Sequence, residues 1–234
     1  MIRNVGWLSS VWRITTVNPL IEIFESRKNG FKESHIAPFP EEIPNRLISL
    51  YSEKGNYVLD PFCGSGTTNF MAVLLGRKTI GYDIEEKYIE ITREKCNNRG
   101  LFFCKSSEKM EEVYNNSIKL CITSPPYLKL RDYSSNPKNI GNMENPLPSI
   151  KNVFIEIFRV LKTEGHFCLN VSEVFNQEKK ELTTFPYDLL KICKEIGFKL
   201  ENTIIWDKDT NLKEWNIKYN KMITNHEYIW VFRK

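Results

Sequence analysis

One nine-residue segment, Asp60–Thr68 (D-P-F-C-G-S-G-T-T), constrains the fold of this 234-residue chain more than any other. It lies between the apolar run 57–59 and the apolar run 70–75, so it predicts a turn that leads from a strand into a helix. The two glycines of the segment allow a ligand to approach the backbone closely. Turns of this kind occur at the carboxyl ends of strands in open α/β sheets, which is where such sheets bind ligands.

Apolar periodicity and turn residues predict seven strands that alternate with helices along most of the chain. The strands are expected at 56–60, 78–83, 100–104, 118–122, 165–171, 199–206 and 226–232, and the helices at 41–52, 67–76, 85–98, 150–161 and 186–196. This order predicts an α/β fold with a doubly wound, mostly parallel, seven-stranded Rossmann-like sheet. Because no helix separates the last two strands, the final strand is expected to be antiparallel.

We expect residues 1–234 to form a single domain, since the length and the 41% of hydrophobic residues suffice for one large core. Three segments rich in Asn, Lys, Ser and Tyr do not fit the layers, namely an N-terminal extension at 1–34 and loops at 128–149 and 207–225. Long irregular segments in a compact domain are usually functional or disordered.

Composition excludes some classes of protein and leaves others open. The formal charge of +4 permits contact with a polyanion without requiring it. The six cysteines form no C-x-x-C pair, which favours reduced, buried thiols in a cytosolic protein over disulfides or a zinc site, and no metal is expected. No run of about 18 apolar residues is present, so we expect a cytoplasmic protein without a membrane span.

A second turn is predicted at Thr123–Tyr127 (T-S-P-P-Y), directly after the apolar run 120–122. Because the carboxyl ends of neighbouring parallel strands meet at one edge of a sheet, the two turns are expected to share one crevice.

The first turn and the strand after it suggest a nucleoside ligand. Backbone N–H groups at 64–67 and at the start of the next helix are candidates to hold a carboxylate or a phosphate. A dinucleotide fingerprint would place a third glycine where Asn69 stands. Asp83 ends the next predicted strand, where a carboxylate can accept hydrogen bonds from two ribose hydroxyls, although an N-cap of the following helix is an alternative role.

The segment Asp60–Thr68, together with Gly81-Tyr82-Asp83, resembles the S-adenosylmethionine site of the amino-methylating DNA methyltransferases. Residues 35–40 (H-I-A-P-F-P) resemble an H-x-x-x-F-P element of the same family. The resemblance implies S-adenosylmethionine as cofactor. The cofactor-binding residues that it implies are His35, Phe39, Asp60, Pro61, Phe62, Cys63, Gly64, Ser65, Gly66, Thr67, Thr68, Asp83 and Ile84.

Residues 123–133 resemble the T-S-P-P-Y-x-x-L-R-D-Y segment of the same enzymes, in which an exocyclic amine attacks the methyl group of the cofactor. The Ser124 side chain and the Pro125 carbonyl would accept the amine hydrogens and aim the lone pair. Pro126 would stiffen the turn, and Tyr127 would stack on the flipped base. Cytosine methylation at carbon 5 is disfavoured, since it needs a thiolate that typically comes from a Pro-Cys dipeptide in this loop.

A serine at the first position of this motif is typical of enzymes that methylate cytosine N4, which is our prediction. Methylation of adenine N6 is the nearest alternative, followed by an RNA or protein substrate and by a catalytically idle cofactor-binding subunit. The expected setting is a restriction-modification system with duplex DNA as substrate and a companion restriction endonuclease.

In the subgroup of this family with the most similar motif sequences, the T-S-P-P-Y motif usually precedes the D-P-F-x-G-S-G-T-T motif. Here the order is reversed, which a circular permutation explains. The chain also ends where a target-recognition region often follows. Base reading is therefore expected from the loops 128–149 and 207–225, from a homodimer or from a separate specificity protein. The candidate DNA contacts in these loops are Lys129, Arg131, Lys213 and Lys218.

Overall fold

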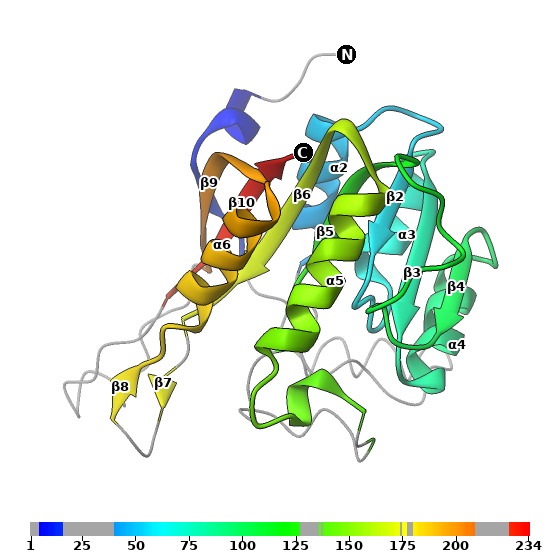
Figure 1. The fold of residues 1–234 in the computed structure, drawn as a ribbon. Coiled ribbons are helices and arrows are strands. Elements are labelled where there is room, and N and C mark those ends of the chain that lie inside the picture. The colour runs from blue at the N-terminus through cyan, green and yellow to red at the C-terminus, as the bar shows by residue number, and fades with distance from the viewer. Residues whose placement is uncertain are drawn as a thin grey trace.

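The computed structural model describes residues 5–15, 40–126, 136, 138–173, 175–176, 180–208 and 225–234. Its main sheet has eight strands in the order β1-β9-β10-β6-β5-β2-β3-β4 (Figure 1). The strands of this sheet are β1 (Val11–Arg13), β2 (Tyr57–Asp60), β3 (Lys78–Asp83), β4 (Leu101–Cys104), β5 (Ile118–Thr123), β6 (Leu161–Val171), β9 (Lys199–Asp207) and β10 (His226–Arg233). A separate small hairpin pairs β7 (Phe175–Asn176) with β8 (Glu181–Leu182).

The predicted α/β class with a mostly parallel sheet is confirmed. The final strand, β10, runs antiparallel to both β6 and β9, as expected, and the other pairs of the main sheet are parallel. The predicted number of seven strands is wrong, because β1 adds an eighth by pairing with β9 at the sheet edge. Strand β1 has three residues, of which only Trp12 is buried. This stretch of the N-terminal segment 1–34 is therefore too short to show the alternation of apolar and polar residues that predicts a strand.

Helices cover both faces of the sheet (Figure 1). They are α2 (Glu42–Tyr51), α3 (Thr67–Leu74), α4 (Glu86–Lys95), α5 (Leu147–Val160) and α6 (Phe185–Ile196), with short 3-10 turns η1 (Val5–Leu8) and η2 (Ile140–Asn142). On one face, α5 and α6 bury residues such as Phe154 and Leu189 against Phe167 and Phe232. On the other face, α2 and α3 pack Leu47 and Met71 against the sheet, and α4 lies beside α3.

Two element boundaries near the predicted loop 128–149 differ from the prediction. Helix α5 begins at Leu147 rather than at 150, with Pro148 in its first turn, where the missing N–H of proline is tolerated. Strand β6 begins at Leu161 rather than at 165, because the chain passes from α5 directly into the sheet. Within the described residues, no helix has the length and apolarity that crossing a membrane demands.

Parallel strands place their carboxyl ends at one edge of the sheet, the lower edge in Figure 1. Asp60, Asp83, Cys104 and Thr123 are the last residues of β2, β3, β4 and β5, which are adjacent in the sheet. The segments that follow these four residues therefore meet at the same place, and they form the site described next.

Candidate active site

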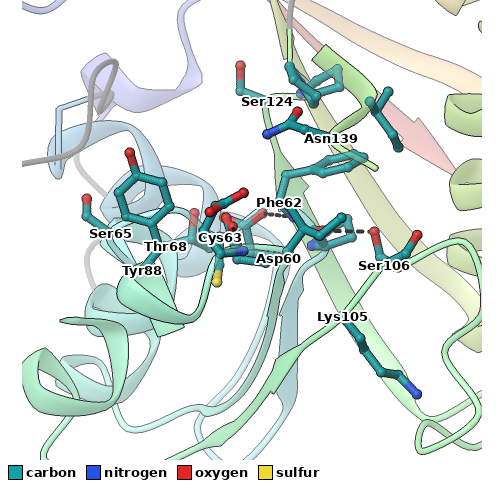
Figure 2. Close-up of a pocket in the computed structure, with 18 of the residues that line it drawn as sticks. Asp60, Phe62, Cys63, Ser65, Thr68, Tyr88, Lys105, Ser106, Ser124 and Asn139 are labelled. Atoms are coloured by element: carbon teal, nitrogen blue, oxygen red, sulfur yellow. Dashed lines mark hydrogen bonds between the residues drawn. The ribbon is translucent and has the colours of Figure 1, made fainter. Parts of the chain in front are cut away.

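An open crevice of about 1020 Å³, including the space open to solvent, lies at this edge (Figure 2). Both predicted turns contribute to its walls, so the structure brings them together in one crevice. The predicted site residues that line it are Asp60, Pro61, Phe62, Cys63, Ser65, Thr67, Thr68, Asp83, Ile84, Ser124, Pro125 and Pro126. A crevice of this size suits a ligand as large as a nucleoside derivative.

The turn Asp60–Thr68, which we call the cofactor turn, is held by hydrogen bonds of its own backbone amides. The amide of Phe62 donates to Asp60 Oδ1 at 3.1 Å, and that of Gly64 donates to Asp83 Oδ2 at 2.9 Å. The amide of Gly66 donates to the carbonyl of Cys63 at 2.8 Å. Of the amides at 64–67 that were expected as candidates to hold an anion, those of Gly64 and Gly66 donate within the protein and shape the turn.

Gly66 is the position of the cofactor turn where only glycine fits. It precedes α3 with φ of 77°, a left-handed conformation that favours glycine. A Cβ atom there would lie 2.6 Å from the side chain of Thr92 on α4. The Thr92 hydroxyl in turn donates to the carbonyl of Gly64 at 2.9 Å, so α4 packs directly against the turn.

Asn69, which stands where a dinucleotide fingerprint would have its third glycine, has a structural role. Its side-chain amide donates to Thr79 Oγ1 at 2.8 Å and to the carbonyl of Ile80 at 3.1 Å. These bonds tie the first turn of α3 to β3. Gly81 lets them approach, since a Cβ there would lie 3.0 Å from the Asn69 nitrogen.

Asp60 links the cofactor turn to the strand that carries the second turn. The Thr123 hydroxyl donates to Asp60 Oδ1 at 2.7 Å, and both residues are buried, with exposed fractions of 3% for Asp60 and 0% for Thr123. Burial raises the pKa of Asp60 to about 6, against the hydrogen bonds from Thr123 and Phe62 that lower it. The crevice thus holds a carboxyl group that ionises near neutral pH.

Asp83 is half-buried at the end of β3 and faces the same crevice. Besides the amide of Gly64, it accepts the amide of Glu85 on its other oxygen at 2.9 Å. The N-cap residue of α4 is Glu85, so the alternative role of Asp83 as N-cap is wrong. Burial raises the pKa of Asp83 to about 6. Each carboxylate oxygen has a second lone-pair site that can accept a hydroxyl.

The second turn, residues 124–126, is called the target turn here. Pro125 is buried, whereas Ser124 and Pro126 are partly exposed toward the crevice. Figure 2 shows Ser124 next to Asn139 and away from Ser65 and Tyr88. The target turn and the start of α3 therefore line different parts of the crevice wall.

Several crevice residues were not predicted from the sequence. They are Glu85, Tyr88, Lys105, Ser106, Ser107, Lys138, Asn139 and Ile140. Ser106 and Ser107 follow the predicted strand 100–104, so the rule that located the two turns would have found them. Ser107 donates its hydroxyl to the carbonyl of Pro61 at 2.9 Å. No sequence pattern predicts that Tyr88 lines the crevice, because the direction of its side chain depends on how α4 is rotated about its own axis.

Other predicted site residues lie outside the described residues. These are His35, Phe39, Tyr127, Lys129, Arg131, Lys213 and Lys218. In the described start of the loop 207–225, Lys208 forms an ion pair with Glu227 at 2.6 Å. All six cysteines are free, and only Cys104 is exposed. In the described ranges, no group of three or more His, Cys, Asp or Glu residues is arranged to hold a metal ion.

The chemistry of the crevice fits S-adenosylmethionine, a nucleoside that carries a sulfonium and an ammonium group. Asp60 and Asp83 line the crevice with carboxyl groups, which in ionised form attract cations and accept hydrogen bonds from hydroxyls. The Glu85 Oε1 atom is buried and has no hydrogen-bond partner among the described residues, which leaves an acceptor for a hydroxyl group. Tyr88 and Phe62 add apolar surface for the base.

Comparisons with known proteins agree with this fit. A family model described as DNA methylase, of the N6 and N4 type, matches residues 2–94 and 118–234. The chain is similar to the type II methyltransferase M.MjaI of Methanocaldococcus jannaschii, with 40% identity over 89 residues that cover 38% of this chain and 27% of the relative. It is also similar to M.HpaI of Haemophilus parainfluenzae, with 35% identity over 108 residues that cover 46% of this chain and 32% of the relative.

These matches span about a third of the length of the curated relatives or less. The fold resembles a solved TehB-like SAM-dependent methyltransferase from Corynebacterium glutamicum, with a TM-score of 0.56 and 16% identity over 93% of this chain and 100% of that chain. Because the family model covers most of the sequence, the chain belongs to the N6/N4 DNA methylase family, and S-adenosylmethionine is its cofactor.

Proposed function

We propose that this protein transfers a methyl group from S-adenosylmethionine to the N4 amine of a flipped cytosine in duplex DNA. The observation that carries the proposal is the shared crevice, whose walls include Asp60 and Asp83 as well as Ser124. The donor and the acceptor must share one crevice, because methyl transfer to an amine is an in-line displacement.

In this proposal the cofactor turn binds the methyl donor. When bound, S-adenosylmethionine supplies a methyl group on a positively charged sulfur. The carboxylates of Asp60 and Asp83 favour a cation, and Asp83 accepts hydrogen bonds from the ribose hydroxyls. Pro61, Phe62, Cys63, Ser65, Thr67, Thr68 and Ile84 provide the surrounding walls. His35 and Phe39 complete the site by the family resemblance, and Gly64 and Gly66 act by shaping the turn.

The target turn prepares the amine. An aromatic amine is a weak nucleophile because its lone pair is conjugated with the ring. The Ser124 side chain and the Pro125 carbonyl accept the two amine hydrogens, which directs the lone pair toward the methyl group. Pro125 and Pro126 lack backbone N–H groups, so no donor competes for these acceptors. Tyr127 stacks on the extruded base and offsets part of the cost of unstacking.

The choice of cytosine rests on Ser124. Family members with serine at this position tend to act on cytosine N4, whereas aspartate or asparagine is usual for adenine N6. The alternative, adenine, requires the same displacement chemistry, so it changes the base and leaves the assigned roles intact.

The proposed setting is a restriction-modification system, which is supported by the similarity to the type II methyltransferases M.MjaI and M.HpaI. The substrate is duplex DNA, and a companion endonuclease cleaves unmethylated sites. Lys129, Arg131, Lys213 and Lys218 contact phosphates in this proposal, and the loops around them read bases, alone, as a homodimer or with a specificity protein. Residues 1–234 act as one catalytic domain with a circularly permuted motif order.

Product analysis tests the proposal directly. Purified protein is incubated with labelled S-adenosylmethionine and mixed-sequence duplex DNA, and the DNA is digested to nucleosides for mass spectrometry. We expect N4-methylcytosine. N6-methyladenine would correct the base, and the absence of any modified nucleoside, despite measured cofactor binding, would refute the proposed reaction on free duplex DNA.

A further inference from the structure

The backbone pairing of strands β2 and β5 ends near the crevice, and beyond it a side-chain hydrogen bond joins the two strands. The backbone pairing of the two strands runs from Val58–Leu120 to Leu59–Cys121. Beyond this pairing, the Thr123 hydroxyl of β5 donates to Asp60 Oδ1 of β2 at 2.7 Å. This bond lies where the strands diverge, directly before the cofactor turn on one strand and the target turn on the other.

Thr123 is well placed to transmit position between the turns. On its other side it pairs with Leu169 of β6 in a parallel ladder, so its backbone is held firmly. The next residue in the chain is Ser124, and the proline rings of Pro125 and Pro126 limit the freedom of the turn beyond it. A shift of Asp60 relative to Thr123 would therefore change the distance between the two turns.

We propose that Thr123 is a positioning residue for methyl transfer, whose hydroxyl group holds the Asp60 carboxylate and sets the spacing of the cofactor and target turns. This inference rests on the function proposed above. Thr123 itself is completely buried and is absent from the crevice wall, so it acts through Asp60 and Ser124.

The hydrogen bond from Thr123 can be followed through the pKa of Asp60, because few other groups stabilise the ionised Asp60 carboxylate. The titratable groups that face its carboxyl group are Asp83 at the end of β3, Cys63 in the cofactor turn and Cys121 on β5. None of these groups is a cation. The ionised form of Asp60 is therefore stabilised by hydrogen-bond donors, chiefly Thr123 and the amide of Phe62, and removing one donor raises the pKa of Asp60.

Two substitutions at this position separate the hydroxyl group from the shape of the side chain. Thr123→Val removes the donor and keeps the volume, whereas Thr123→Ser keeps the donor. Thr79→Val is the matched control, because Thr79 is equally buried on β3 and its hydroxyl contacts Asn69 instead of a crevice carboxylate. Asp60→Ala, which removes the acceptor for the Thr123 hydroxyl, is made alone and combined with Thr123→Val and completes a double-mutant cycle.

The first measurement is the pKa of Asp60 in the cofactor-free protein, from the pH dependence of its carboxyl carbon NMR signal, which Asp60→Asn assigns. The second is the turnover number at saturating cofactor. We expect Thr123→Val to raise the pKa of Asp60 by about one pH unit and to lower turnover about tenfold. Thr123→Ser should restore both values to within about twofold of wild type. Thr79→Val should lower stability and leave the pKa of Asp60 unchanged.

An unchanged pKa and turnover in Thr123→Val would overturn the inference. A turnover loss that persists at full size in the Asp60→Ala background, where no acceptor remains for the hydroxyl, would overturn it as well. Should Thr123→Val not fold, Thr123→Cys, with its weakly donating thiol, replaces it and should shift both values in the same direction. Wild-type protein that binds S-adenosylhomocysteine and methylates no DNA refutes the proposed function, whereas active wild-type and equally active Thr123→Val protein refute this inference alone.

Discussion

The cofactor turn and the target turn lie in one crevice, and they are stiffened in different ways. Side chains from other elements hold the cofactor turn, including Asp83 at the end of β3, Thr92 on α4 and Ser107 after β4. The target turn is stiffened by its own prolines, and the bonded Thr123 precedes it. The contacts of the cofactor turn depend on the tertiary fold, whereas the stiffening by proline rings is covalent and local.

This difference matches what each turn is proposed to do. A cofactor with many polar groups needs a wall whose donors and acceptors are fixed in advance, because preorganised contacts lower the cost of binding. The amine needs only two acceptors in the correct place, and a proline-stiffened carbonyl provides one of them. Substitutions in the two turns should therefore have distinct kinetic signatures, and the following predictions test this contrast.

The largest effect is expected for Gly66→Ala in the cofactor turn. The new methyl group would lie 2.6 Å from Thr92 and force a residue with φ of 77° to change, so we expect a loss of stability of about 3 kcal/mol and loss of cofactor binding. Gly55→Ala is the control, since φ there is 83° and no atom lies within 4 Å; it should cost about 1 kcal/mol. Equal losses in chemical denaturation would mean that contact with α4 does not constrain the turn.

Ser124→Ala should give the opposite signature in the target turn. Loss of an acceptor for the amine should lower turnover about a hundredfold, while the dissociation constant of S-adenosylhomocysteine stays within about twofold. Ser117→Ala, at the other end of the same strand, should leave both values unchanged. Weak cofactor binding with normal turnover in Ser124→Ala would assign Ser124 to the cofactor site instead.

Asp83→Asn should act on cofactor binding alone. Because a neutral amide replaces one acceptor with a donor, we expect the dissociation constant to rise about tenfold, with turnover at saturation within a few-fold of wild type. Asp188→Asn on α6, where an exposed carboxylate accepts the Thr184 hydroxyl, is the control. Calorimetric titration measures the affinity, and an unchanged value would remove Asp83 from the ribose contact.

The smallest effect is a pH dependence of cofactor affinity. Asp60 and Asp83 each have a pKa of about 6 in the cofactor-free protein, and the cationic cofactor favours their ionised forms. Protons therefore compete with binding, and affinity should fall about fourfold from pH 8 to pH 6 and further below that. Asp83→Asn should reduce this dependence to about twofold over the same range. A flat profile in titrations at pH 6, 7 and 8 would contradict the proposed contacts.

The same two carboxyl groups affect folding stability. Their pKa values in the folded protein lie above the value of 3.8 that Asp has when unperturbed. Between about pH 4 and pH 6 the folded state therefore binds more protons than the unfolded state, so stability falls as pH rises through this range. A bound cation would offset this loss of folding stability, because it favours the ionised carboxylates. The cofactor should therefore stabilise the folded protein more at pH 7 than at pH 5.

Much of the fold was predictable from the sequence because its signals are local. Within the described part of the chain, seven of the eight strands of the main sheet and the five α-helices follow from apolar periodicity, with small errors at their ends. Strand β1 was missed because only Trp12 of its three residues is buried, and because it pairs with β9, which is almost 200 residues away in the chain. The early start of α5 was missed because Pro146 and Pro148 suggest a loop as readily as a helix start.

The location of the site was also predictable from the sequence, because both predicted turns line the crevice. The sequence by itself determined the two turns, because glycine and proline restrict the backbone locally and because strand order brings the turns to one edge. Only the tertiary structure decided that the amides of Gly64 and Gly66 bond internally, that Tyr88 and Asn139 reach the crevice, and that Thr123 holds Asp60. The physical reason is that these contacts depend on the rotation and spacing of elements far apart in the chain, and those are fixed by core packing that no local pattern encodes.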